Sequence, residues 1–426
     1  MTGAPITAAG TGSSELVERC QVCDSTELKP ALFLGYMPPV NQMRIVGERP
    51  VEQASYPAEM LYCTNCNLVQ LGLIVDPAIL FPADYPYTSG MTRILHQNFE
   101  DLAVESRELL SLTAENLVVD IGSNDGTLLS KFQAQGHRVQ GIEPTDAGDL
   151  AVAAGIPTTK AFFSRNTAAV VKADVGNAML VTAANVFAHI EDVHAIVEGI
   201  LELLDQHGVF VSESHYLMGL LDRCQYDTIY HEHLRYYSVR SLRNLLEMHG
   251  LEIIHVRKIP THGGSIRVYA ARKGERPIQD SVALILDQEQ GRGDPFEQLT
   301  AFRIEVSASK MGLYAMLHDI RSSGGRVYGI GAPSRASTLV NYVGLDESMI
   351  DCVLELPGSH KLGKYMPGTL IPVEEETRLF QDPPDYALIL SWHIADELMP
   401  KLSAKGFMGD YIVPLPTPRI VRAGGT

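Results

Sequence analysis

The stretch LVVDIGSNDG at residues 117–126 decides how the middle of this chain folds. An apolar run with the length of a buried strand ends in a turn that contains Gly122 and Gly126, and the next residues, TLLSKF, have a helical pattern. Glycine tolerates positive φ and lets a backbone approach a ligand closely. The sequence therefore predicts a strand, a ligand-binding turn and a helix, the first unit of a parallel α/β sheet.

The acidic residues of this turn indicate its ligand. Asp120 and Asp125, with Asn124 beside them, would repel a pyrophosphate but attract the amino group and sulfonium of S-adenosylmethionine. Glu143 ends the next apolar run, RVQGIE, about 20 residues further on, where a carboxylate can accept hydrogen bonds from both ribose hydroxyls. We therefore predict a methyl-donor site. A tight turn in an unrelated α/β protein is the alternative.

Three more residues are candidates for the same crevice. Phe162 and Phe163 follow the stretch GIPTTKA and are expected either to flank the adenine or to be ordinary core residues. Asn185 ends the apolar run AMLVTAANV and should face the crevice from the carboxyl end of that strand.

The same alternation of strands and helices continues outward from residues 117–126. RVQGIE, AMLVTAANV and GVFVSES are further strand candidates of the middle block, and a helical pattern at residues 94–109 precedes it. A later block opens with an amphipathic segment from Pro295 to His318 and adds RVYGIG, IDCVLEL, YALILSW and YIVPLP. At 426 residues the chain exceeds one comfortable core. We predict an α/β protein with domains at 1–80, 81–274 and 275–426.

Four of the six cysteines form two CxxC pairs, which are candidate metal ligands. Each pair places two thiolates on one tight turn, so two turns together complete the four-sulfur tetrahedron that Zn²⁺ accepts. A redox pair is the alternative, but such a pair normally begins a helix after a strand, and neither pair clearly follows a strand. We predict a structural zinc site formed by Cys20, Cys23, Cys63 and Cys66. The isolated Cys224 and Cys352 are expected to be packed.

Composition excludes several classes of partner. A formal charge of −17, without a basic stretch, argues against nucleic acid. The first fifteen residues lack the basic start and apolar core of an export signal, and nowhere do eighteen apolar residues run together. We expect a soluble cytoplasmic protein without a membrane partner, for which a monomer is plausible.

The segment QYDTIYHEHLRYYS at residues 225–238 is crowded with side chains that can transfer protons. Ser238 is a good N-cap for the helix that follows, and Gly250 would end that helix. Glu232 and His233 should therefore lie just before the helix, above the sheet edge where the donor methyl points. A metal site at His231, Glu232 and His233 is a weak alternative, because neighbouring residues point to opposite sides of an extended chain. A purely structural hydrogen-bonded loop is another.

With these segments in view, the chain resembles the sugar C-methyltransferases that act on dTDP-4-keto-deoxysugars in antibiotic pathways. The likeness covers nearly the whole chain. Its motifs occur in the family's order: LFLGYMPPVNQM with the CxxC pairs, YPYTS, VVDIGSNDGTLL, GIPTTKAFF, NVFAHI, YDTIYHEHLRYYS, HGGSIRVY, GAPSRASTLVNY and KLGKYMPGTLIPV. The resemblance implies a Rossmann-like class I methyltransferase domain between a small N-terminal zinc-binding domain and a second, Rossmann-like C-terminal α/β domain, which together enclose the sugar.

The resemblance also implies roles for individual residues. His233 matches the family's base, with Glu232, Tyr230 and His189 in support, and either Tyr85 or Tyr87 of YPYTS joins them. As a mechanism, neutral His233 would remove the C3 proton of a 4-keto-sugar, Glu232 or a neighbour would hold its tautomer, and Tyr230 or His189 would stabilise the enolate oxygen. Methyl transfer to oxygen or nitrogen of another natural product, or binding without catalysis, is the alternative.

The remaining candidates concern the substrate, a nucleotide-linked sugar. His262, Gly263 and Ser265 would wall its pocket, or else serve tight packing. Arg335 lies beside the turn Gly329-Ile-Gly331, which could cradle a phosphate or be merely structural. The family motifs also contain Asn41, Lys361 and Tyr365. Two segments depart from the family pattern: GAPSRAST has Arg335, Ala336 and Ser337 where the family commonly has Lys, Gly and Asn, and LELPGSHKLGKYMPGT lacks the usual Asn-Pro before its lysine. Substrate identity is therefore less well defined than reaction type.

Overall fold

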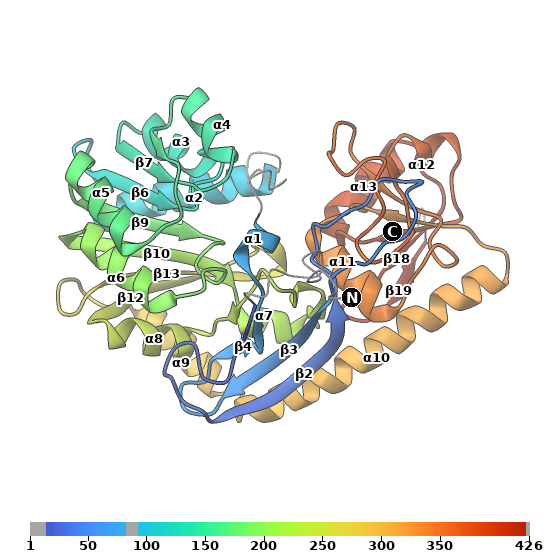
Figure 1. The fold of residues 1–426 in the computed structure, drawn as a ribbon, viewed down its shortest axis with the longest axis horizontal. Coiled ribbons are helices and arrows are strands. Elements are labelled where there is room, and N and C mark those ends of the chain that lie inside the picture. The colour runs from blue at the N-terminus through green and yellow to red at the C-terminus, as the bar shows by residue number, and fades with distance from the viewer. Residues whose placement is uncertain (1–13, 82–92, 423–426) are drawn as a thin grey trace, which may run out of the picture.

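The computed structural model of the chain describes residues 14–81 and 93–422, so Tyr85 and Tyr87 lie outside the described residues. Figure 1 shows three sheet-based units: a central unit in green and yellow, an N-terminal sheet in blue, and a C-terminal unit in orange and red. Among the described helices, none is both long and apolar enough to cross a bilayer.

The central unit is a seven-stranded sheet in the order β12-β13-β10-β9-β6-β7-β8. All neighbours pair in parallel except β13, which is antiparallel to both β10 and β12. From β6 the chain moves outward to β7 and β8 and then returns to β9 on the other side of β6, which makes a topological switch point there. The strands are β6 (Leu117–Ile121), β7 (Arg138–Ile142), β8 (Thr158–Thr159), β9 (Ala178–Ala184), β10 (Leu204–His215), β12 (Leu251–Ile259) and β13 (Ser265–Arg272).

Helices cover both faces of this sheet, which explains why strand β6 is apolar except for Asp120. Leu117, Val119 and Ile121 of β6 pack into one core, together with residues of the α5 and α6 helices, and Val118 packs into the other, together with α2 and α3. The continuous run LVVDI is therefore the pattern of a strand that is buried on two faces. The helices are α2 (Arg93–Leu110), α3 (Thr127–Ala134), α4 (Ala147–Ala153), α5 (Arg165–Val175), α6 (Val193–Leu203), α7 (Leu217–Asp222) and α8 (Val239–Met248).

The N-terminal sheet is antiparallel and incorporates a strand from the middle of the chain. Its order is β11-β4-β3-β2, with β2 at Leu28–Met37, β3 at Tyr56–Cys63 and β4 at Val69–Leu71. The fourth strand, β11, is Arg235–Tyr236, inside the 225–238 segment, and the N–H of Leu71 donates to the Leu234 carbonyl at 2.9 Å. Short elements complete the unit: β1 (Glu15–Leu16), β5 (Leu73–Ile74) and α1 (Pro77–Leu80).

The C-terminal unit is a second, smaller doubly wound sheet, as the sequence predicts. Its order is β16-β15-β14-β17-β18-β19, parallel except for the last pair. All four strand candidates of this block form strands. The elements are β14 (Val327–Ile330), α11 (Ser334–Val343), β15 (Cys352–Glu355), β16 (Val373–Glu375), α12 (Arg378–Gln381), β17 (Tyr386–Ile389), α13 (Ala395–Ala404), β18 (Asp410–Val413) and β19 (Arg419–Val421).

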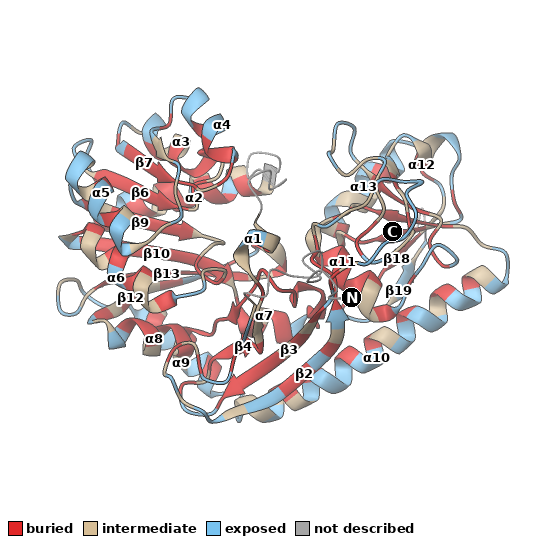
Figure 2. Ribbon diagram, in the orientation of Figure 1, coloured by how far each residue is buried: buried red, intermediate tan, exposed pale blue. Residues whose placement is uncertain are grey.

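Two helices link the central unit to the C-terminal one, α9 (Asp280–Gln290) and α10 (Pro295–Ser322). α10 runs beneath the N-terminal sheet toward the C-terminal sheet (Figure 1). Its buried residues recur every three or four positions, from Leu299 to Ile320. One side of the helix therefore faces the protein and the opposite side faces water (Figure 2).

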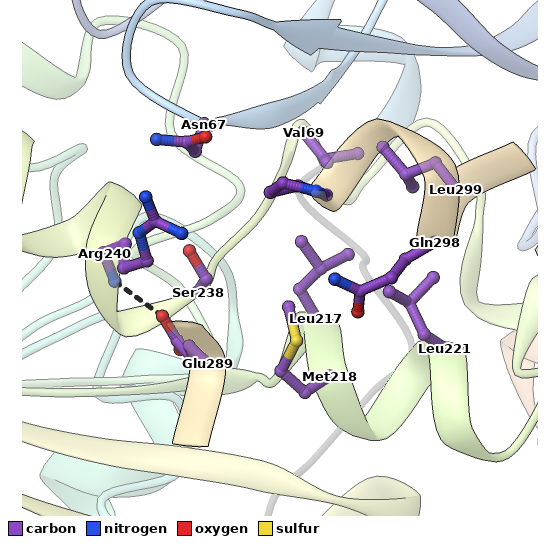
Figure 3. A pocket seen from close by; sticks show the side chains of 11 residues that line it. Asn67, Val69, Leu217, Met218, Leu221, Ser238, Arg240, Glu289, Gln298 and Leu299 are labelled. Atoms are coloured by element: carbon purple, nitrogen blue, oxygen red, sulfur yellow. Dashed lines mark hydrogen bonds between the residues drawn. The ribbon is translucent and has the colours of Figure 1, made fainter. Parts of the chain in front are cut away.

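The helix after the 225–238 segment begins at a strongly capped N-terminus. Ser238 and Ser241 form a reciprocal capping box, and the buried carboxylate of Glu289 on α9 accepts from the N–H groups of Val239 and Arg240 at 2.7 and 3.1 Å. Figure 3 shows this junction, where α7, α10 and the N-terminal sheet enclose a cavity of about 20 Å³ beside Glu289. The start of α8 is therefore held by several elements. The predicted helix from Ser238 to Gly250 is confirmed.

Candidate active site

The turn at residues 120–126, here called the donor loop, has the backbone that its glycines predict. Gly122 and Gly126 have φ of 67° and 76°, and Gly126 is the N-cap of α3. A Cβ at Gly122 would lie 2.7 Å from Cγ2 of Val186, and one at Gly126 would lie 3.0 Å from Cγ1 of Ile156. We expected the missing side chains to make room for a ligand. In the structure they make room for neighbouring protein side chains.

Asp120 ends β6 as a buried acid. Its carboxylate accepts from the Thr182 hydroxyl at 2.6 Å. Burial raises the pKa of Asp120 to about 7, helped by the negative charges of Glu143 and Glu213 and opposed by the Thr182 bond. A cation beside Asp120 would restore its ionised form, so the donor set at this edge fits the positively charged S-adenosylmethionine.

Glu143 and Asp125 both bind the donor loop itself. The Glu143 carboxylate accepts from the Asn124 N–H at 2.9 Å, and its other oxygen accepts from the N–H and hydroxyl of Thr145 at 2.9 and 2.6 Å. Since a carboxylate offers about four acceptor positions, capacity remains for a ribose hydroxyl. Asp125, which precedes the N-cap of α3, binds the first residue of that helix, because its Oδ1 accepts from the N–H and hydroxyl of Thr127 at 3.2 and 2.6 Å.

The other donor-site candidates are placed differently from one another. Asn185 follows β9 with φ of 60°, and its Oδ1 atom is buried without a hydrogen-bond partner among the described residues. Phe163 packs against Gly199 of α6, as its core alternative predicts. Phe162 is 62% exposed. The buried Oδ1 atom of Asn185 therefore has spare acceptor capacity at this edge.

His233 is held by the backbone of its own segment. Its Nδ1 atom lies 2.7 Å from the Thr228 carbonyl oxygen, so Nδ1–H donates and the neutral ring keeps a lone pair on Nε2. Burial lowers the pKa of His233 to about 4, with further lowering by the charges of His262 and Arg335 and opposition from the Thr228 bond. We expected Glu232 or a neighbour to orient the ring, and the orienting group is the Thr228 carbonyl.

Four imidazoles lie together here and are called the histidine cluster: His189, His215, His233 and His262. The His233 ring centroid is 5.0 Å from that of His189, 4.9 Å from that of His215 and 4.1 Å from that of Tyr230, and His262 lies 5.5 Å from His215. Burial lowers the pKa of His189 and His215 well below the ordinary value, and that of His262 to about 4. These rings are neutral near pH 7.

Sequence reasoning missed His215, although a signal was present. It is the last residue of β10, and β10 neighbours β9 at the carboxyl edge where ligands of such sheets bind. Two residues earlier, the Glu213 carbonyl accepts from the N–H of Asn185 at 2.8 Å, so the histidine cluster adjoins the donor edge.

The histidine cluster is not a metal centre. In residues 14–81 and 93–422, only the four CxxC cysteines place three or more metal-ligating atoms close together. His231 also turns away from His233: its Nε2 lies 3.2 Å from the Pro57 carbonyl oxygen, and its ring is 5.7 Å from that of Tyr56. The metal site considered for His231, Glu232 and His233 is therefore not formed.

Groups from all three units meet at Glu232. Its Oε1 accepts from Nδ2 of Asn41 at 2.9 Å, and Oδ1 of Asn41 lies 3.3 Å from the Ser334 hydroxyl at the start of α11. Lys361 donates to the Ala332 carbonyl at 2.5 Å, and burial lowers the pKa of Lys361 against the opposing charges of nearby carboxylates, Glu232 among them. Asn41 and Lys361 thus reach the predicted acceptor side of the site.

Tyr365 fastens the N-terminal unit to the C-terminal one. Its hydroxyl accepts from the Gly47 N–H at 3.1 Å, its own N–H donates to the Arg44 carbonyl at 2.7 Å, and the Arg44 guanidinium lies 5.6 Å from its ring centroid. In this structure the phenol side chain of Tyr365 therefore contacts the loop that contains Arg44 and Gly47.

Residues of the HGGS segment, 262–265, have different surroundings: one lies in the histidine cluster and others pack against protein. His262, with φ of 54°, brings its ring to the histidine cluster. A Cβ at Gly263 would lie 2.7 Å from Oε1 of Gln225, and the Ser265 hydroxyl donates to the Thr261 carbonyl at 3.0 Å. Gly263 and Ser265 thus follow the packing alternative.

The predicted phosphate cradle is occupied by protein carboxylates. Arg335 forms a bidentate ion pair with Asp227 at 2.7 and 2.8 Å, where a phosphate was expected. After the turn ending at Gly331, the Ala332 N–H donates to Oε2 of Glu355 at 3.0 Å. The structural alternative for this turn therefore describes the observed contacts.

The four cysteines of the CxxC pairs lie together at the edge of the N-terminal sheet. The Cys20 and Cys66 sulfurs are 3.4 Å apart, those of Cys23 and Cys63 are 3.5 Å apart, and all four sulfurs lie within 4.8 Å of one another. A zinc tetrahedron with bonds of about 2.3 Å needs sulfurs about 3.8 Å apart, so the set fits zinc. One expectation is corrected: Cys63 ends β3, but its turn leads to β4 and not to the helix of a redox pair.

Three family models match successive parts of the chain. The first, described as "Putative zinc binding domain", matches residues 20–81, a methyltransferase domain matches 94–256, and a C-methyltransferase C-terminal domain matches 260–416. C-methyltransferase NovU from Streptomyces niveus is 31% identical over 416 residues, which is 96% of this chain and 98% of the relative.

Solved structures resemble part of this chain only distantly. Magnesium protoporphyrin IX methyltransferase from Synechocystis, with bound SAM, is 14% identical with a TM-score of 0.32 and covers 42% of this chain and 79% of its own. The PH0226 protein from Pyrococcus horikoshii is 13% identical with a TM-score of 0.34 and covers 47% and 97%. The sheet order, the cysteine cluster and the family models carry the assignment instead. The chain belongs to the C-methyltransferase family, with an S-adenosylmethionine-dependent methyltransferase domain between a zinc-binding domain and a C-terminal α/β domain.

Proposed function

We propose that this C-methyltransferase deprotonates C3 of a nucleotide-linked 4-keto-deoxysugar and methylates the resulting carbanion. The observation that carries the proposal is the state of His233: a buried neutral imidazole whose Nδ1–H is bound by the Thr228 carbonyl, which leaves Nε2 as the base. Methylation at carbon needs such a base, because an unactivated C–H bond offers no electron pair to an electrophile.

A ketone next to the reacting carbon makes this proton removable. His233 Nε2 takes the proton, and the electron pair of the C–H bond moves into the enolate and onto its oxygen. The Thr228 carbonyl, as acceptor of Nδ1–H, stabilises the imidazolium that forms. A low basicity of the free enzyme's imidazole is compatible with this role, because a bound enolate beside it would favour its charged form.

Tyr230 is suited to stabilise the enolate oxygen. Its ring lies beside that of His233, and burial together with the charge of Glu232 raises the pKa of Tyr230 well above the ordinary value. The phenol therefore stays protonated and can donate a hydrogen bond to developing negative charge. Neutral His189, whose ring centroid lies 5.0 Å from that of His233, is a second donor.

The donor loop and its neighbours would hold the cofactor, with Asp120 near its cationic groups, Glu143 toward its ribose and Asn185 at the adjacent strand. S-adenosylmethionine supplies an electrophilic methyl group on a sulfonium. Asn41, Glu232 and Lys361 would line the acceptor side, where the Lys361 ammonium uses one donor on Ala332 and can direct others to a diphosphate.

One assay tests reaction class and substrate together. Purified protein is incubated in D₂O with S-adenosylmethionine and a panel of nucleotide-linked 4-keto-sugars, and mass spectrometry and NMR report the product and the labelled carbon. The proposal predicts deuterium at C3 without the methyl donor and a methyl group at C3 with it. Methylation at oxygen or nitrogen without C3 exchange would contradict it, and so would a protein that does not bind S-adenosylmethionine in calorimetry.

The variant His233→Ala isolates the base. C3 exchange and methylation should fall by a factor of about 10² to 10⁴, because general base catalysis is lost, while calorimetric affinity for S-adenosylmethionine stays unchanged. His318→Ala, a substitution of an exposed histidine on α10, serves as the matched control and should keep full activity. Unchanged C3 exchange in His233→Ala would move the base elsewhere.

A further inference from the structure

Arg335 joins the C-terminal domain to the segment that carries the proposed base. It lies in the first turn of α11 and is only 6% exposed. Nε and Nη2 donate to the two oxygens of Asp227, Nη2 also donates to Oε1 of Gln225 at 3.1 Å, and Nη1 donates to the His262 carbonyl at 3.2 Å. One guanidinium therefore fastens two catalytic-domain segments at once.

A second group of the C-terminal domain converges on the same carboxylate. The indole Nε1–H of Trp392 donates to Oδ2 of Asp227 at 2.7 Å, and the Arg335 guanidinium lies 4.9 Å from the centroid of the Trp392 ring. The Asp227 side chain is fully buried. Its buried charge is thus compensated by Arg335 and by an indole donor, both from the C-terminal domain.

A short covalent path leads from this contact to His233. Asp227 and Thr228 are consecutive residues of the 3-10 helix Tyr226–Thr228. The Thr228 carbonyl accepts from Nδ1 of His233 at 2.7 Å, and the Thr228 hydroxyl donates to the Gln225 carbonyl at 2.8 Å. A displacement of Asp227 would therefore shift the acceptor that sets the tautomer and direction of the imidazole.

We propose that Arg335 is a positioning residue, through which the C-terminal domain holds Asp227, the Thr228 carbonyl and hence the His233 imidazole in the orientation for proton abstraction. This role rests on the proposed function of His233. The sequence suggested instead that Arg335 contacts a phosphate of the substrate. In the structure, its guanidinium donates hydrogen bonds to protein acceptors. Arginine suits the position because its planar fork reaches a carboxylate with two bonds and other acceptors with the rest, which an ammonium cannot do.

The charge of Arg335 also acts on the histidine cluster. The His233 ring lies beside those of His189, His215, Tyr230 and Tyr236, and burial lowers its pKa to about 4, with further lowering by the charges of His262 and Arg335. Removing the guanidinium should therefore raise the pKa of His233 and move the acid limb of the exchange rate to higher pH.

The test compares Arg335→Met and Arg335→Lys with the native full-length enzyme, using C3 exchange in D₂O and methylation across pH. Arg335→Met should lower kcat for exchange by about 10- to 100-fold, the cost of a small misplacement of a catalytic group, with KM for the sugar nucleotide and affinity for S-adenosylmethionine within about twofold. Arg335→Lys should fall between Arg335→Met and wild type. Arg326→Met removes an arginine of an exposed ion pair in the same domain and should behave as wild type.

Stability is separated from positioning by a further variant. Arg335→Met leaves Asp227 buried without its ion pair, so thermal unfolding is measured beside it and beside Asp227→Asn/Arg335→Met, which removes both charges. The double variant should recover stability but not kcat. If Arg335→Met does not fold, the double variant and Arg335→Lys provide the same test: kcat for exchange should fall while KM for the sugar nucleotide stays nearly unchanged.

Three outcomes would overturn the inference: a rise in KM of tenfold or more at unchanged kcat, which indicates a phosphate contact; an acid limb that does not move; or full kcat in the double variant. Retained exchange in His233→Ala would instead refute the proposed function, so the two failures are distinguishable.

Discussion

The proposed donor edge and the proposed acceptor side of this enzyme are built in different ways. The donor loop and Glu143 lie close in sequence on adjacent strands, and their side-chain hydrogen bonds join residues of the central unit that are 2 to 62 positions apart, Asp120 with Thr182 being the longest span. The acceptor side depends on bonds between distant residues: Asn41 with Glu232 is 191 positions apart, and Asp227 with Arg335 is 108. A local sequence pattern therefore describes the donor edge, whereas the acceptor side exists only when three domains have docked.

The two regions also differ in electrostatics, although burial is the cause in both. Burial disfavours charge, so it raises the pKa of Asp120 at the donor edge to about 7 and lowers those of His233 and His262 on the acceptor side to about 4. Each region thus contains a buried titratable group whose uncharged form is favoured by burial. The two regions should contribute opposite pH dependences to stability.

The largest effect is expected from removing zinc, which should damage the acceptor side and leave the donor edge intact. Cys63→Ser should abolish stoichiometric zinc by elemental analysis and lower turnover at least about 100-fold, because binding of a structural zinc contributes folding free energy and the sheet it holds pairs with β11 beside His233. Affinity for S-adenosylmethionine should stay within about threefold. Cys352→Ser, the same change away from the cluster, should keep zinc. A metal-free variant that remains stable and active would refute a structural zinc.

The next effect concerns stability and pH. Asp120 has a folded pKa above its unfolded one, so its stabilisation is present below about pH 4 and is lost as pH rises toward 7; each pKa unit corresponds to about 1.4 kcal/mol. For His233 and His262 the folded pKa is depressed, so their contribution is present above about pH 6.5 and is lost as pH falls toward 4.

Asp120→Asn should remove only the first of these contributions. The free energy of urea unfolding, followed by circular dichroism between pH 4 and 7, should then rise more steeply with pH than in wild type, by a few kcal/mol over the range. Asp149→Asn, at an exposed acid of α4, is the control. Identical pH slopes in wild type and Asp120→Asn would show that Asp120 ionises normally.

The smallest effect tests the independence of the donor edge. In Glu143→Gln one carboxylate oxygen becomes an amide donor that faces the Asn124 N–H or the Thr145 donors, which should cost about 1 to 3 kcal/mol and weaken S-adenosylmethionine binding about tenfold or more. C3 exchange without the methyl donor should be unaffected. Asp149→Asn again serves as control. Equal loss of exchange and of donor affinity would mean that the two regions are not separable.

Much of the donor edge and the framework was predictable because the deciding signals are local. The run at 117–121 is apolar except for Asp120 because its strand is buried on both faces. Positive φ at Gly122 and Gly126 follows from their place in the turn, and Ser238 is the N-cap of a helix. The CxxC pairs predict a four-sulfur site because each pair lies on one tight turn, which fixes the positions of its two sulfurs.

The sequence by itself thus determined the main strands and helices, the backbone of the turn at residues 120–126, the four cysteines of the zinc site and the place of His233 shortly before α8. Only the tertiary structure decided that the Thr228 carbonyl orients His233, that β11 joins the N-terminal sheet, that His215 reaches the cluster, and that Arg335 meets Asp227. Backbone conformation and capping depend on neighbours within a few residues, whereas the partner of a buried polar side chain is chosen by the need to satisfy its charge or hydrogen bonds among whatever groups the docked domains bring near.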